Sequence, residues 1–264
     1  MDLKEEEILK KNVYSHWYYV SKGLAILDFV KNLKVNIILD IGAGSGVFSK
    51  TILQNTGARE ATCLDTGYVA EKEEMGQGKK LKYVKTLSKS NADLVLLVDV
   101  LEHVKDDISF VKKYVDKLDK GTNLFVSVPA FEFLFSGHDI FLEHYRRYTI
   151  TSLEACLKAC GLTIVKSRYY FFTLFPFIAI LRVLTKAQMK FFSKTFVPKS
   201  SLKLHGKLIN KVLIIIHKLE LLSLSNNKLA GLTVFCLAIK KSFRSKVKIN
   251  SFLFSSVKFA FLSK

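Results

Sequence analysis

Short apolar runs and helical segments alternate along the middle of the chain. The apolar runs predict strands near residues 36–41, 61–65, 82–84, 93–98, 123–128 and 163–170. The segments between them predict helices near residues 46–55, 106–118 and 151–160. Strands that alternate with helices run parallel and carry helices on both faces of the sheet. We therefore expect an α/β fold with a doubly wound, mostly parallel sheet.

Both ends of the chain add elements to this core. Residues 5–33 have apolar positions at helical spacing and predict one or two helices that cover the core. Residues 231–239 predict a last strand, which brings the expected sheet to seven strands. Between these ends, residues 169–181 are apolar for only about 13 positions and contain Pro176, whereas a membrane-spanning helix needs roughly 20. We expect this run to be buried or interfacial.

Residues 203–222 predict a basic amphipathic helix. At about 100° per residue, the lysines fall within one arc of the helix and the leucine, isoleucine and valine side chains fall mainly within another. The lysines of this stripe are Lys203, Lys207, Lys211 and Lys218, and the apolar arc holds Leu204, Leu208, Val212, Ile215, Leu219 and Leu222.

A strand, a tight turn and the start of a helix are predicted over residues 37–49. Three glycines, at positions 42, 44 and 46, allow a sharp turn and a close approach of the backbone to a ligand. Their G-x-G-x-G spacing differs from the G-x-G-x-x-G of dinucleotide-binding folds, because Val47 occupies the third glycine position. Asp65 ends the next strand about 20 residues later, where such folds bind ribose hydroxyls. Together these features favour one adenosine-bearing ligand.

Ionisable side chains gather after two of the predicted strands. Asp99, Glu102 and His103 follow the strand at 93–98, at the carboxyl edge of the sheet, where open α/β sheets bind their ligands. A second group lies between Pro129 and Thr149. Its members are His138, Asp139, Glu143, His144, Tyr145, Arg146, Arg147 and Tyr148. Clusters of this kind are typical of functional sites, and an internal salt-bridge network that orders the segment is the competing interpretation.

The sequence resembles a class I S-adenosylmethionine-dependent methyltransferase. The resemblance rests on Leu39–Gly46, Asp65 and Val98–His103, and it continues through His138-Asp139 and His144–Thr149. The last two pieces are similar to a subgroup related to the ubiquinone-biosynthesis methyltransferases and to methyltransferases of bacterial surface-glycan synthesis. The resemblance implies a Rossmann-like sheet, S-adenosylmethionine as the cofactor, and O-methylation of a small or lipid-linked acceptor.

The resemblance and the residue types assign candidate roles. The candidate cofactor-binding residues are Asp40, Gly42, Gly44, Gly46, Asp65, Asp99 and Val100. The candidate catalytic residues are His103, His138 and His144, as general bases for a hydroxyl acceptor. The candidate substrate-binding residues are Trp17, Asp139, Tyr145, Arg146 and Arg147, with the arginines suited to an anionic acceptor. No metal is expected, since His138, Asp139 and His144 lack a distinctive ligand spacing.

Positive charge is concentrated in the last third of the chain. Residues 168–264 hold 18 basic residues and one acid, Glu220, out of a net charge of +18 for the whole chain. Basic and apolar residues together favour an anionic membrane surface over nucleic acid as a partner. Solvated lysines on helices that pack on the sheet are the alternative.

The chain is expected to comprise four parts and to work in the cytoplasm, in peripheral contact with the inner face of a membrane. The parts are an N-terminal helical segment (1–35), the cofactor-binding core (36–168), an apolar and basic extension (169–240) and a basic aromatic tail (241–264). The four cysteines form no C-x-x-C pair, and the N-terminus lacks the pattern of a signal peptide. The competing function is a methyltransferase-like binding protein without turnover, since residues 85–91 lack the acid that the family places near adenine.

Overall fold

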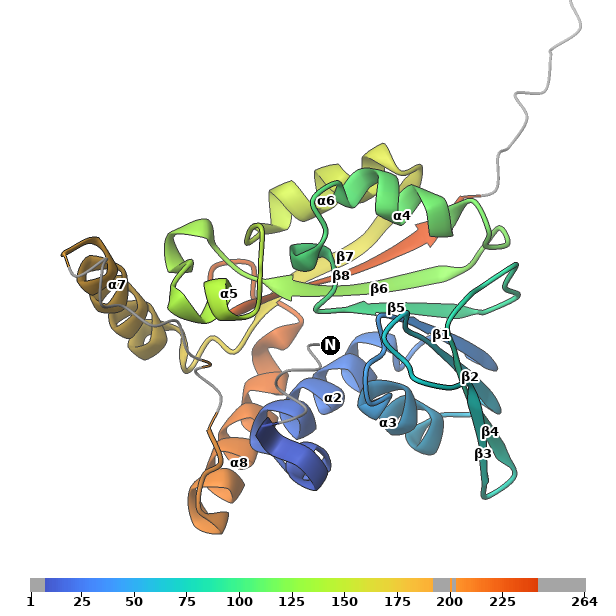
Figure 1. The fold of residues 1–264 in the computed structure, drawn as a ribbon, viewed down its shortest axis with the longest axis horizontal. Coiled ribbons are helices and arrows are strands. Elements are labelled where there is room, and N and C mark those ends of the chain that lie inside the picture. The colour runs from blue at the N-terminus through green and yellow to red at the C-terminus, as the bar shows by residue number, and fades with distance from the viewer. Residues whose placement is uncertain (1–7, 192–199, 201–202, 242–264) are drawn as a thin grey trace, which may run out of the picture.

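The computed structural model describes residues 8–191, 200 and 203–241, and in this part the chain forms one eight-stranded sheet (Figure 1). The strands lie in the order β3-β4-β2-β1-β5-β6-β8-β7. Their bounds are β1 (Ile37–Ile41), β2 (Glu60–Leu64), β3 (Lys72–Gly76), β4 (Lys79–Val84), β5 (Leu94–Val98), β6 (Asn123–Pro129), β7 (Leu162–Tyr170) and β8 (Thr233–Lys240). Strands β4, β2, β1, β5 and β6 are parallel, and β8 runs antiparallel to β6 and β7. The predicted doubly wound, mostly parallel sheet is confirmed.

Helices cover both faces of the sheet, as the alternation of strands and helices predicts (Figure 1). They are α2 (Trp17–Val30), α3 (Val47–Asn55), α4 (Asp107–Val115), α5 (Gly137–Phe141), α6 (Ile150–Ala159), α7 (Phe175–Phe191) and α8 (Lys207–Leu224), with short 3-10 turns η1 (Lys10–Tyr14), η2 (Leu101–His103) and η3 (Glu132–Leu134). Strand β5 is buried along its whole length, and its side chains belong to two separate hydrophobic cores. One core packs against α2 and α3, and the other against α4 and α6.

The sheet has eight strands where the sequence predicts seven. The extra strand, β3, pairs antiparallel with β4 at the edge of the sheet, through a turn in which Gln77 and Gly78 both have positive φ. Because β3 lies at the edge, its Lys-Glu-Glu-Met-Gly sequence is mostly exposed and shows no apolar alternation. A pattern search for buried strands therefore misses it.

The N-terminal segment confirms the expectation of one or two helices from residue 8 onward, since residues 5–7 lie outside the described part. A break at Ser15 and His16 separates η1 from α2, and the His16 side chain caps α2 by accepting a hydrogen bond from the N–H of Tyr18. The 169–181 run is divided between the end of β7 and the start of α7.

Helices α7 and α8 form an extension between β7 and β8 (Figure 1). The amphipathic helix predicted over 203–222 is confirmed as α8, which begins four residues later and packs against α2. Within the described residues, no helix is long and apolar enough to cross a membrane. Nearly all of the predicted tail, 242–264, lies outside the described part of the chain.

Candidate active site

The turn between β1 and α3 is built so that only glycine fits it. Gly42, Gly44 and Gly46 all have positive φ, between 52° and 71°. A Cβ on Gly42 would lie 2.7 Å from a methyl group of Val100, and one on Gly46 would lie 2.9 Å from the Cys63 sulfur. Side chains other than hydrogen would therefore both strain and crowd the loop. The turn leaves a cradle of bare backbone at the carboxyl edge of the sheet.

Asp65 lies beside this glycine turn, as the sequence predicts. Strands β1 and β2 are parallel neighbours, and the N–H of Gly44 donates a hydrogen bond to Asp65 Oδ2 over 3.0 Å. The N–H of Gly67 donates to the other carboxylate oxygen over 2.9 Å, and the Tyr68 hydroxyl donates to the carbonyl of Gly44 over 2.7 Å. Bare backbone beside an acceptor carboxylate fits the adenosine and methionine parts of S-adenosylmethionine.

Asp40 points toward α3. It is buried, and the Ser49 hydroxyl of α3 donates to its Oδ2 over 2.8 Å. Burial raises the pKa of Asp40 to about 6. These contacts connect β1 to the helix that follows the glycine turn, and the expected contact of Asp40 with the cofactor stays a prediction.

Lys22, which is not among the candidate residues from the sequence, forms an ion pair with Asp99. Lys22 of α2 is fully buried, and its Nζ lies 2.6 Å from Asp99 Oδ1. The Ser127 hydroxyl donates to the same oxygen over 3.1 Å, and the Tyr18 hydroxyl donates to Oδ2 over 3.2 Å. Burial alone would raise the pKa of Asp99, but the Lys22 ammonium outweighs it and holds that pKa below its usual value. Asp99 is therefore an ionised carboxylate at the end of β5. Its ion pair with Lys22 holds α2 against the edge of the sheet.

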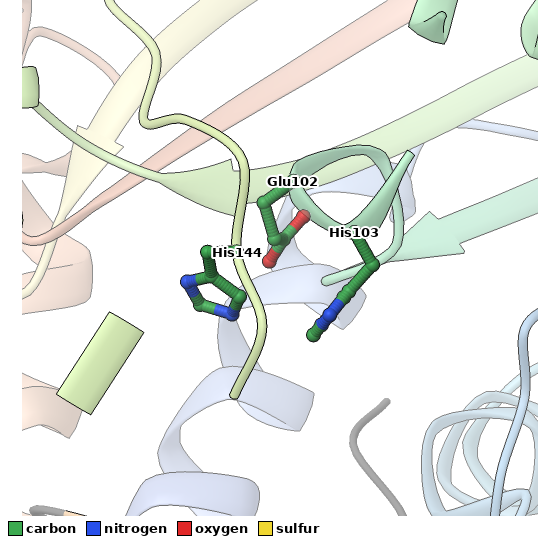
Figure 2. Close-up of side chains that lie close together, drawn as sticks. All are labelled: Glu102, His103 and His144. Atoms are coloured by element: carbon green, nitrogen blue, oxygen red, sulfur yellow. The ribbon is translucent and has the colours of Figure 1, made fainter. Parts of the chain in front are cut away.

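Three side chains converge next to this carboxylate (Figure 2). Glu102 and His103 come from η2 after β5, His144 comes from the segment after α5, and the rings of the two histidines are 4.6 Å apart at their centroids. Glu102 is 1% exposed, and its Oε2 has no hydrogen-bond partner among the described residues. Burial, and then Asp99, raise the pKa of Glu102 well above its usual value. Burial, and then the charge of His144, lower the pKa of His103 to about 4.

These three side chains could also hold a divalent cation. Each offers one ligand atom, and the three atoms all lie within 4.8 Å of one another. From the sequence, a different set is the candidate for metal binding, His138, Asp139 and His144, and no metal is expected there. Strand order, which places the turn after β5 beside the segment after β6, explains the difference, since it brings Glu102 and His103 to His144.

Asp139 is the central contact of the second group of ionisable side chains, between Pro129 and Thr149. His144 Nδ1 lies 3.0 Å from its Oδ1, Arg147 Nε lies 2.7 Å from the same oxygen, and an Arg182 guanidinium nitrogen lies 2.9 Å from Oδ2. Burial would raise the pKa of Asp139, but the bond with His144 and the charges of Arg147 and Arg182 hold it well below its usual value. An ionised carboxylate only accepts hydrogen bonds, so His144 donates to it from Nδ1, and Nε2 is the ring nitrogen left to face an acceptor.

His138 lies beside this network. Burial, followed by the charge of Arg182, lowers its pKa to about 3, so the ring is neutral at pH 7. A group with so low a pKa is a weak base for a hydroxyl proton. The contact of the His144 ring with Asp139 is what favours His144 among the three candidate histidines. The sequence could not separate them, because it does not show which ring has an orienting acid.

The remaining substrate-binding candidates have different surroundings. Trp17 stacks on His217 of α8 with ring centroids 5.4 Å apart, and Tyr145 is 58% exposed. Arg146 pairs with Asp107 over 3.3 Å, and Arg147 donates to Asp139 and to the carbonyl of Ala130. The contacts of both arginines are those of an internal network, the competing interpretation of this segment, and their role in substrate binding stays a prediction.

Comparison with known proteins agrees with the fold. Residues 16–167 match the family described as a methyltransferase domain. The ubiquinone biosynthesis O-methyltransferases of Yersinia pestis and Yersinia pseudotuberculosis are 29% identical to this chain over 150 residues, which are 48% of this chain and 61% of the relatives.

Two solved structures share the fold at low sequence identity. One is a Haloferax volcanii methyltransferase in complex with the Trm112 methyltransferase activator (TM-score 0.53, 11% identity, 91% of this chain and 94% of that chain). The other is Haemonchus contortus phosphoethanolamine N-methyltransferase 2 in complex with S-adenosyl-L-methionine (TM-score 0.52, 16% identity, 90% and 56%). The chain belongs to the methyltransferase domain family, within the class I S-adenosylmethionine-dependent methyltransferases.

Proposed function

We propose that this protein transfers the methyl group of S-adenosylmethionine to an oxygen atom of a small or lipid-linked acceptor, with His144 as the general base. The observation that carries the proposal is the pair of Asp139 and His144. Their 3.0 Å contact fixes the tautomer of His144 so that Nε2 can accept a proton at the carboxyl edge of the sheet.

The cofactor supplies an activated methyl group, so this chain's residues need only position the acceptor and remove its proton. The glycine turn and Asp65 would hold the cofactor. The turn at Asp99 and Val100 lies beside the glycines, since Val100 is the nearest neighbour that a side chain at position 42 would meet. His103 and His144 lie just beyond this turn, where an acceptor hydroxyl would meet the methyl group.

The relatives support an oxygen acceptor, since those that match over 150 residues carry the name O-methyltransferase. The chain spans about 61% of the length of those relatives, so their acceptor is not carried over to it. The N-methyltransferase of Haemonchus contortus is 16% identical and bears on the fold alone. The intact glycine turn and its contact with Asp65 favour an enzyme over a binding protein without turnover.

The experiment is methyl transfer from methyl-labelled S-adenosylmethionine to a panel of hydroxylated acceptors, including quinols, catechols and glycosylated lipids. Replacing His144 by Ala should lower turnover by about 100-fold or more while cofactor affinity stays unchanged. The matched control is His205→Ala, which removes an exposed histidine away from the cluster and should leave turnover unchanged. Parent-level turnover in the His144 variant would refute the assignment of the base.

A chelator arm of the same assay separates proton transfer to His144 from metal-assisted deprotonation. If turnover persists after treatment with EDTA, the result supports His144, without a metal ion, as the group that removes the proton. Loss of turnover with EDTA, recovered by added Mg²⁺, Mn²⁺ or Zn²⁺ in the parent chain and not in Glu102→Gln, would instead assign Glu102, His103 and His144 as a metal site.

A further inference from the structure

Helices α7 and α8 place buried polar side chains, as well as apolar ones, against the rest of the protein. On α8, His217 and Glu220 are buried, and Glu220 accepts hydrogen bonds from the N–H of Phe172 over 2.6 Å and from the Thr173 hydroxyl over 2.8 Å. On α7, Arg182 reaches inward to Asp139. In a helix that packs on a core, the inward face is normally the apolar one. Here buried polar side chains share the inward face with apolar ones, such as Leu224 of α8, which is 1% exposed.

The outward faces of the two helices are apolar. On α8, Leu208 is 76% exposed, Leu219 is 62% exposed and Leu222 is 84% exposed. On α7, Phe177 is 66% exposed and Ile180 is 62% exposed. The apolar arc that the sequence predicts for residues 203–222 therefore points away from the protein. Exposed apolar surface of this extent indicates a binding surface.

The charge around this surface has one sign. Lys207, Lys211 and Lys218 of α8 are exposed beside the leucines, and Lys186 of α7 is also exposed. Glu220 is the only acid between residues 168 and 264, and it is buried against His217. The described part of this region therefore presents lysines and no carboxylate to the solvent.

We propose that α7 and α8 dock on an anionic lipid bilayer, with their apolar faces in the headgroup boundary and their lysines against anionic headgroups. A partner that matches both aliphatic side chains and lysines is a charged interface with an apolar interior. A second copy of this chain would bring lysines against lysines. Nucleic acid would leave the leucines without partners, because bases stack on aromatic rings.

The proposed membrane surface adjoins the candidate active site. Arg182 of α7 contacts Asp139, the residue that orients His144. Asn210 of α8 accepts a hydrogen bond from the N–H of Trp17 over 2.7 Å, at the start of the helix that carries Lys22 to Asp99. The carboxyl ends of β5 and β6 point toward the side on which α5, α7 and α8 lie (Figure 1). A bilayer on this surface would present a lipid-linked acceptor to His144, an extension that rests on the proposed function.

The test is co-sedimentation of the full chain with vesicles of phosphatidylcholine alone or mixed with phosphatidylglycerol, without cofactor or acceptor. The parent should bind only the mixed vesicles, and added salt should weaken its binding. Two triple variants, Leu208→Ser/Leu219→Ser/Leu222→Ser and Lys207→Glu/Lys211→Glu/Lys218→Glu, should each weaken binding by about tenfold or more. The matched control is Val69→Ser/Met75→Ser, which changes apolar residues that are 96% and 66% exposed near the edge strand β3.

Equal binding to both kinds of vesicle, no binding to either, or no effect of both triple variants would overturn the proposal. Sedimentation velocity of the protein alone supplies a second decision: if the leucine variant converts a dimer into a monomer and the parent does not bind vesicles, the surface is a contact between copies. Vesicle binding is measured without methyl transfer. A chain that binds vesicles but never methylates would therefore refute the proposed function and leave the membrane surface standing.

Discussion

The carboxylate of Asp139 joins three segments of the chain. It contacts His144 and Arg147 from the loop after α5, and Arg182 from α7. Because it is fully buried, removal of any one partner would leave a hydrogen bond of this carboxylate unmade in a place that water does not reach. The same residue therefore sets the protonation of the candidate base and anchors the extension to the core.

His138, next to this carboxylate, should make the protein sensitive to acid. Its pKa is lowered to about 3 in the folded protein by burial and then by Arg182, with Asp139 opposing and Arg147 adding to the shift. The unfolded chain binds a proton near the ordinary pKa of about 6.5, so between these values unfolding takes up a proton. The contribution of His138 to stability is therefore complete above about pH 6.5 and is lost as the pH falls toward 3.

Thermal unfolding of the parent and of His138→Gln, followed from pH 7 to pH 4, measures this contribution. Gln stays neutral throughout, so the melting temperature of the variant should fall less steeply with acid than that of the parent. Equal slopes would mean that His138 is accessible to protons in the folded protein.

At this scale, the sequence could predict the residues that lie at strand ends and could not predict their partners. Gly42, Gly44 and Asp65 were predictable because parallel strands bring their carboxyl ends to one edge. Lys22 and Arg182 were not, since the partner of each lies 77 or 43 positions away in the sequence. Only the path of the chain in space shows which carboxylate each one reaches.

At the scale of elements, the connection into β8 requires a glycine at position 231. A Cβ on Gly231 would lie far inside contact distance of the carbonyl oxygen of Tyr170 and 2.9 Å from its nitrogen. That carbonyl already accepts the N–H of Leu232, so the backbones of β7 and β8 meet closely here. Strand β8 in turn supplies the pairing edge for β6, which leads into the candidate site.

Gly231→Ala should lower the free energy of unfolding by about 2 kcal/mol or more, because backbone atoms would have to move. Gly57→Ala is the matched control, since nothing lies within 4 Å of a Cβ there, and it should leave stability nearly unchanged. Urea unfolding of the two variants measures both values. Equal midpoints for Gly231→Ala and the parent would show that the two strands separate more easily than their contact suggests.

Two elements have features that the hydrophobic periodicity of the sequence does not determine. Strand β3 is charged and exposed, so its existence depends on a two-residue turn and not on burial. The period of α8 was predictable, but a helical wheel does not show which arc faces the core. In this protein the buried residues of α8 are His217, Glu220 and Leu224, and the apolar arc that the sequence predicts faces out.

At the scale of the whole molecule, the excess positive charge lies in the last third of the chain, which also completes the sheet. Residues 1–167 have nearly equal numbers of acids and bases, and they include the family match at 16–167. The basic last third supplies α7 and α8 outside the sheet, and the end of β7 and all of β8 within it. The fold class was predictable because strand and helix signals alternate strongly. Which face of the extension is exposed was not predictable, because composition does not show how a helix is oriented on the core.

The central claim, that the glycine turn and Asp65 form a pocket for S-adenosylmethionine, is tested most directly by isothermal titration calorimetry. The parent chain should bind S-adenosylmethionine and its demethylated product at one site. Asp65→Ala should weaken both by about tenfold or more, since ribose hydroxyls would lose their acceptor, while the exposed control Asp119→Ala should bind like the parent. No binding by the parent, or equal affinities in the parent and Asp65→Ala, would contradict the assignment.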